Sequence, residues 1–91
     1  MTVAAEAKPK LSPLFRMQWE EVQQCHVLLY PEGMVKLNHS AGEIMKRCDG
    51  VRSVDDIVAD LETSFNANGL HPEVDAFLDI AYAKGWLVKA V

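Results

Sequence analysis

The chain has 91 residues, 49% of them hydrophobic, and a formal net charge of −4 at pH 7. This length fits one globular domain, and its nine Lys and Arg residues are too scattered to form the basic face that nucleic acid requires. No apolar run reaches the ~18 residues of a membrane-spanning helix, and the N-terminus lacks the apolar segment of a signal peptide. The two cysteines are too few for a disulfide scaffold. We therefore expect a cytoplasmic protein with no nucleic-acid or membrane partner.

The first part of the chain predicts a tail followed by a strand. Residues 1–10 are mostly small or polar and include a proline near their end, so we expect a flexible tail before a domain over residues 11–91. Between Phe15 and Trp19, apolar and polar residues alternate strictly. This period of two predicts a half-buried strand.

Two further strands are expected to form a hairpin. The apolar segments from Cys25 to Tyr30 and from Met34 to Leu37 are rich in strand formers. Between them, Pro31 fixes one backbone φ angle and Gly33 permits a positive one, which is typical of a turn. The three strands together predict an antiparallel sheet.

The periodicity becomes helical from residue 40 onward. Ser40 and Glu43 have the spacing of a capping box, in which each side chain accepts a bond from a free backbone amide of the other. Gly50 is expected to end this helix. Its apolar face would consist of Ile44, Met45 and Cys48.

Two more helices are expected after residue 52. Ser53 followed by two aspartates predicts a helix start, because acidic side chains favour the positive end of the helix dipole. Pro72 fits the first turn of a third helix, which Lys84 and Gly85 would end. The apolar stripes are Val54, Ile57, Val58, Leu61 and Phe65 in one helix, and Val74, Phe77, Leu78, Ala81 and Tyr82 in the other. Three strands followed by three helices predict an α+β domain.

The sequence contains no pattern typical of a metal or catalytic site. Its histidines and cysteines include no Cys-x-x-Cys or His-x-x-x-His pair. Cys25 and His26 are strand neighbours, so their side chains would point to opposite faces of the sheet. We therefore expect no enzyme activity, no metal and no cofactor.

Three functions that require no chemistry remain open. If the strand ending at Leu37 lies at the sheet edge, its unpaired backbone groups would suit an extended peptide. Lys36 could instead protect that edge, or the edge could pair with a second copy of the chain. A winged-helix DNA-binding domain is a further alternative. However, residues 73–83 of the third helix include Glu73, Asp75 and Asp79 and no Lys or Arg, so phosphates would repel this helix.

Several short segments, taken in order and spacing, resemble the coenzyme PQQ synthesis protein D family. The resemblance covers about residues 11–88. The matching segments are Leu28–Gly33, Leu37-Asn38, Glu43-Ile44, Cys48-Asp49-Gly50, Ser53-Val54-x-x-Ile57-Val58-x-x-Leu61, Phe65, Val74-x-x-Phe77-Leu78 and Gly85-Trp86-Leu87.

This resemblance implies a winged-helix-like recognition element for a ribosomally made peptide that is modified after translation. In that family the peptide is the precursor of pyrroloquinoline quinone. It is delivered to a radical SAM enzyme that links a Glu to a Tyr, while the family member itself performs no chemistry and holds no cofactor.

Carried onto this chain, the resemblance implies that the peptide adds as a strand beside a facing helix. The peptide-binding residues would be Val35, Lys36, Leu37 and Asn38 on the strand, and Val74, Leu78, Asp79 and Tyr82 on the helix. We expect Leu37→Pro to abolish peptide binding and to leave the helices largely intact. Whether the chain is a monomer or a homodimer stays open.

Overall fold

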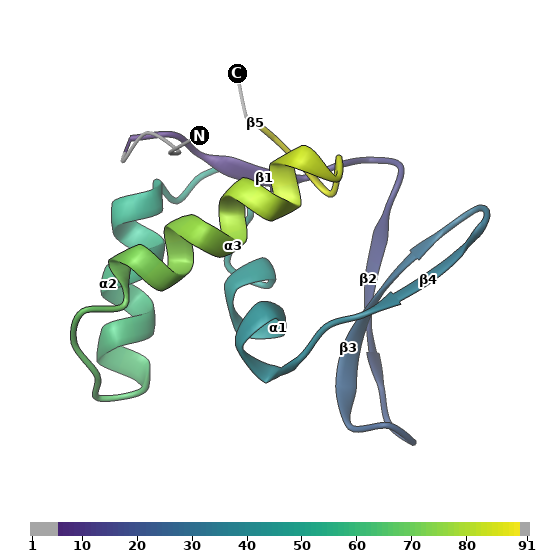
Figure 1. The fold of residues 1–91 in the computed structure, drawn as a ribbon, viewed down its shortest axis with the longest axis horizontal. Coiled ribbons are helices and arrows are strands. Elements are labelled where there is room, and N and C mark those ends of the chain that lie inside the picture. Colours follow the sequence, from purple (N-terminus) through teal and green to yellow (C-terminus); the bar gives the residue numbers. More distant parts are fainter. Residues whose placement is uncertain (1–5, 90–91) are drawn as a thin grey trace.

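The computed structural model describes residues 6–89, which form two small antiparallel sheets and three helices (Figure 1). The elements are β1 (Pro9–Leu11), β2 (Arg16–Glu20), β3 (Cys25–Tyr30), β4 (Gly33–Lys36), α1 (His39–Met45), α2 (Val54–Ser64), α3 (His71–Ala83) and β5 (Leu87–Lys89). Strands β2, β3 and β4 pair in that order, and β1 pairs with β5. The predicted α+β fold, with a three-stranded antiparallel sheet before three helices, is confirmed.

The sheet of β1 and β5 was not predicted from the sequence. Pro9 pairs with Lys89 and Leu11 pairs with Leu87, so the two ends of the described chain lie side by side (Figure 1). Nearby, the backbone N–H of Val54 donates to the carbonyl oxygen of Ala7 at 2.9 Å. The predicted tail over residues 1–10 therefore includes two residues of a strand, while its residues 1–5 lie outside the described residues.

The core lies between the helices and the inner face of β3 and β4. Figure 1 shows the three helices gathered on one side of the β2–β3–β4 sheet. Gly42 brings α1 against β3, since a Cβ atom at this position would lie 2.9 Å from Nδ1 of His26. The buried side chains of this core include Leu28, Leu37, Ile44, Met45, Val54, Ile57, Val58, Leu61, Val74, Leu78 and Leu87.

Helix α1 begins two residues earlier than a cap at Ser40 predicts, and its cap is Asn38. Oδ1 of Asn38 accepts a hydrogen bond from the backbone N–H of Ala41 at 2.8 Å. The predicted capping box of Ser40 and Glu43 is therefore wrong, and the Glu43 carboxylate accepts from Arg47 at 2.9 Å instead. Asn and Ser are both good caps and lie two positions apart here, so sequence spacing alone did not separate them.

A capping box occurs at the start of α2. Oγ of Ser53 accepts from the backbone N–H of Asp56, and Oδ2 of Asp56 accepts from the backbone N–H of Ser53, both at 3.1 Å. Gly50 was predicted to end α1, but the helix already ends at Met45 and Gly50 lies in the following connection with φ +79°. Gly85 follows α3 with φ +77°, as predicted.

Candidate functional site

Strand β4 forms an open edge of the three-stranded sheet, because β3 is its one neighbour in the described residues. The backbone N–H of Leu37 donates to the carbonyl oxygen of His26 at 2.9 Å. In an antiparallel pair, residues alternate between bonding to the partner strand and pointing away from it. The backbone groups of Met34 and Lys36 therefore face away from β3, toward the open side of β4. The edge thus presents two residues to which a further strand could pair.

A groove runs beside the end of this edge, between β4, α1 and α3. We call it the edge groove; its volume is about 390 Å³. Beside Glu73, its α3 side carries two apolar side chains: Ile80 is half-exposed, and the ring of Phe77 lies 6.4 Å from that of Trp86. The lining residues are Lys36, Leu37, Asn38, Ser40, Ala41, Ile44, Glu73, Phe77, Ile80 and Trp86. Exposed apolar side chains beside unpaired strand backbone are the two features that recognition of an extended peptide uses.

The four strand residues predicted to bind peptide lie at this edge, but in different roles. Lys36, Leu37 and Asn38 line the edge groove. Leu37 is only 3% exposed and belongs to the core, while Asn38 also caps α1. Val35 packs against the core with its side chain and faces β3 with its backbone. Among these four, Lys36 alone is an outward-facing strand residue.

The four predicted helix residues do not line the edge groove. Val74 and Leu78 are 2% and 0% exposed and lie in the core. Tyr82 packs against the core, and burial raises the pKa of its hydroxyl. Asp79 is partly exposed on α3. The α3 side chains that line the groove are Glu73, Phe77 and Ile80, on the neighbouring face of the helix.

The groove-lining face of α3 was missed from the sequence because α3 carries apolar residues both on this face and on the face that packs in the core. Phe77 was assigned to the core stripe with Val74 and Leu78, whereas Ile80 was assigned to neither face. The available signal was Ile80 itself, an apolar residue outside the predicted core stripe, followed three positions after the helix by Trp86. Together with the predicted stripe, Ile80 and Trp86 provide more apolar side chains than one buried face of the helix requires.

The described part of the chain does not support a metal site or a membrane-spanning helix. Within residues 6–89, no group of three or more His, Cys, Asp or Glu residues could hold a metal ion. In the same range, no helix is long and apolar enough to cross a membrane. Cys48 is buried, its thiol donates to the carbonyl oxygen of Ile44 at 3.3 Å, and burial raises its pKa to about 12. This thiol is a core group, as predicted.

An open edge strand beside an apolar groove, in a small α+β domain, is the architecture of a domain that binds extended peptides. The family model described as Coenzyme PQQ synthesis protein D (PqqD) matches residues 25–87, and the chain belongs to this family. The family resemblance found in the sequence is thereby confirmed.

Relatives and a solved structure agree with this assignment. The chain is 45% identical over 91 residues to a protein of Methylococcus capsulatus named PqqA binding protein, across 100% of this chain and 98% of that protein. It is 52% identical over 83 residues to the PqqA binding protein of Pseudomonas aeruginosa PAO1, across 90% of each. The solution NMR structure of the PqqD truncation of Methylobacterium extorquens PqqCD is described as a stand-alone recognition element for ribosomally synthesised and post-translationally modified peptides. It matches with a TM-score of 0.75 and 26% identity, across 97% of this chain and 95% of that one.

Proposed function

We propose that this chain binds the precursor peptide of pyrroloquinoline quinone as an added strand on β4. The observation that carries the proposal is the outward-facing backbone of Met34 and Lys36 beside the edge groove. Relatives named PqqA binding protein, and a structural neighbour described as a peptide recognition element, support the identity of the peptide.

The two halves of the site make different contributions to binding. Backbone hydrogen bonds to Met34 and Lys36 hold the peptide in register without reading its sequence. Alternate peptide side chains then enter the edge groove and pack against Phe77, Ile80 and Trp86. Each apolar side chain that is fully buried there contributes about 1.5–3 kcal/mol. The groove therefore reads the sequence of the peptide.

We further propose that the bound peptide is presented to a radical SAM enzyme, while this chain performs no chemical step. Strand addition occupies one segment of the peptide and leaves the rest free to enter a second protein. If the chain also contacts the enzyme, the peptide reaches an effective concentration of ~mM at the enzyme. The chain therefore assists the enzyme by connecting two binding events, and not by catalysing a step.

A proline at Lys36 tests the strand addition directly. Lys36→Pro removes an N–H that faces the open side, and an edge strand tolerates proline at such a position. Lys36→Ala is the matched control, because it removes the side chain and keeps the N–H. In calorimetry with the synthetic PqqA peptide of Methylococcus capsulatus, we expect Lys36→Pro to lose binding and Lys36→Ala to retain it. Equal affinity of wild type and a folded Lys36→Pro variant contradicts strand addition on β4.

A further inference from the structure

A second cavity lies where α1, the α2–α3 loop and the start of α3 meet. We call it the corner cavity; its volume is about 200 Å³. Its apolar lining residues are Ile44, Leu61, Phe65, Ala67, Leu70 and Val74. Since an apolar cavity of roughly 150 Å³ holds a benzene molecule, the corner cavity has room for one apolar side chain.

The corner cavity adjoins the edge groove. Ser40, Ile44 and Glu73 line both spaces, so a chain that leaves the groove over these residues would pass the cavity. The cavity lies beyond the Lys36 end of β4, because its lining includes His39 of α1 but no residue of β4. A peptide paired with Met34 and Lys36 would therefore reach it with a residue outside the paired segment.

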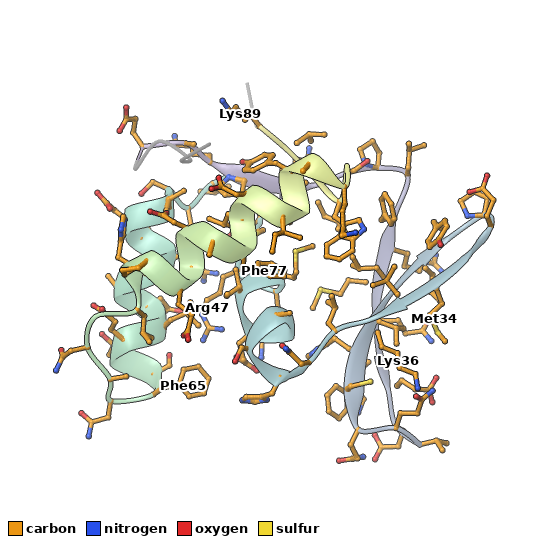
Figure 2. All side chains as sticks on the ribbon, in the orientation of Figure 1. Met34, Lys36, Arg47, Phe65, Phe77 and Lys89 are labelled. Carbon is orange, nitrogen blue, oxygen red and sulfur yellow. The ribbon has the colours of Figure 1, made fainter. Side chains whose placement is uncertain are left out.

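One wall of the corner cavity is an aromatic ring held in place from two sides. Phe65 is 46% exposed, its ring meets that of His39 edge-on with centroids 5.9 Å apart, and Cζ of Arg47 lies 6.0 Å from its centroid. Arg47 is itself fixed by hydrogen bonds to Glu43 and Asp60. Figure 2 shows Arg47 and Phe65 close together between α1 and α2. An exposed ring that is already ordered loses little side-chain entropy when a ligand covers it.

We propose that one apolar side chain of the precursor peptide occupies the corner cavity. This inference rests on the proposed function, since it assumes that the peptide pairs with β4. Two binding points follow: the strand-paired segment, which is held by backbone hydrogen bonds, and one apolar anchor at a fixed distance from it along the peptide. The corner cavity thus selects peptides in which an apolar residue has the correct spacing from the paired segment.

Filling the cavity from the protein side tests the proposal. Ala67→Phe adds an aromatic ring at a partly buried lining position in the α2–α3 loop, without removing a core side chain. Asn68→Phe adds the same ring at the next position, which is exposed and does not line the cavity. With the Methylococcus capsulatus PqqA peptide, we expect Ala67→Phe to weaken binding about tenfold or more, and Asn68→Phe to bind like wild type. Phe65→Ala, which removes the aromatic wall, is expected to weaken binding as well.

An alanine scan of the peptide then identifies the anchor. We expect one apolar peptide residue whose replacement weakens binding to the wild-type chain and leaves binding to Ala67→Phe unchanged, because that variant has no free cavity. Wild-type affinity in folded Ala67→Phe and Phe65→Ala variants overturns this inference alone. If the wild-type chain does not bind the peptide, or a folded Lys36→Pro variant binds it equally well, the proposed function fails and the inference fails with it.

Discussion

Leu37 joins β4 to β3 through the hydrogen bond from its backbone N–H to the carbonyl oxygen of His26, at 2.9 Å. Its side chain, 3% exposed, enters the core next to α1. Because both its backbone N–H and its side chain face the interior of the domain, the main role of Leu37 is to stabilise the fold. The neighbouring Lys36, with the opposite orientation, is the residue at which backbone pairing can be tested without loss of the sheet.

Leu37→Pro is therefore expected to unfold the domain rather than to remove peptide binding selectively. The substitution removes the inward N–H and replaces a buried branched side chain by a ring bent back onto the backbone, so we expect a loss of about 3–5 kcal/mol in the free energy of unfolding. Urea denaturation followed by circular dichroism measures this loss. A Leu37→Pro variant with wild-type stability and no peptide affinity would restore the selective effect expected from the sequence.

The pairing of β4 with β3 could be predicted from the sequence, because the Pro-Glu-Gly turn predicts a hairpin between the two segments that it connects. The face of α3 that lines the edge groove could not be predicted. In α3 both Val74 and Phe77 belong to one predicted apolar stripe, and both contact the core, but Val74 is buried there while the partly buried Phe77 also lines the edge groove. The choice depends on where β4 and Trp86 lie, which is tertiary information. The spacing of apolar residues in a helix indicates which residues share a face, but it does not indicate which other element that face contacts.

The fold shows the same limit at its ends. Helices α2 and α3 begin and end close to the predicted residues because caps, prolines and glycines are local signals. The sheet of β1 and β5 has three residues per strand, too few for a detectable alternation. Its pairing joins residues at opposite ends of the described chain, so no local signal could reveal it.

Gly42→Ala is expected to destabilise the domain, although alanine is the better helix former. The new Cβ would lie 2.9 Å from Nδ1 of His26, so α1 and β3 would have to separate. Overpacking of this kind costs about 1–3 kcal/mol, against a gain of up to about 1 kcal/mol in helix propensity. Thermal unfolding of wild type and Gly42→Ala measures the net loss. In a His26→Ala background the same substitution should be neutral or stabilising; an equal loss there would show that the contact with His26 is not the cause.

Arg47 connects α1 to α2, and its loss should be most damaging near neutral pH. Its guanidinium bonds to the Glu43 carboxylate, which is mostly buried, and to Asp60. We expect Arg47→Met to lose roughly 2–4 kcal/mol at pH 7, because it leaves Glu43 without its charged partner. Chemical denaturation at pH 7 gives this difference. Equal stability of the two proteins would show that methionine packing fully replaces the ion pairs.

The same pair of proteins should converge in acid. Hydrogen bonds from Arg47 hold the pKa values of Glu43 and Asp60 below their ordinary range. A carboxylate whose pKa is lowered on folding stabilises the protein above its unfolded pKa, about 4, and this stabilisation is lost as the pH falls through the folded value. Between about pH 5 and pH 3, wild type should therefore lose more stability than Arg47→Met. A constant difference over this range would contradict the linkage.

Presentation to the radical SAM enzyme predicts a rate effect that depends on β4. With enzyme and peptide held below the concentration at which they associate directly, wild-type chain should raise the rate of Glu–Tyr cross-linking, because it supplies a connected second binding site. Lys36→Pro should have no effect and Lys36→Ala should act like wild type. Mass spectrometry of the peptide over time measures the product. An equal rate with all three proteins would mean that peptide held on β4 is not the form that the enzyme receives.

The open edge of β4 could also pair with a second copy of the chain. Competition by the peptide tests whether the two ligands bind the same edge. If copies associate through Met34 and Lys36, light scattering at high protein concentration should show a dimer that the PqqA peptide dissociates, because both ligands need the same backbone groups. Lys36→Pro should then be a monomer with or without peptide. A dimer that persists at saturating peptide, and in Lys36→Pro, must use another surface, and β4 would be free for the peptide in both states.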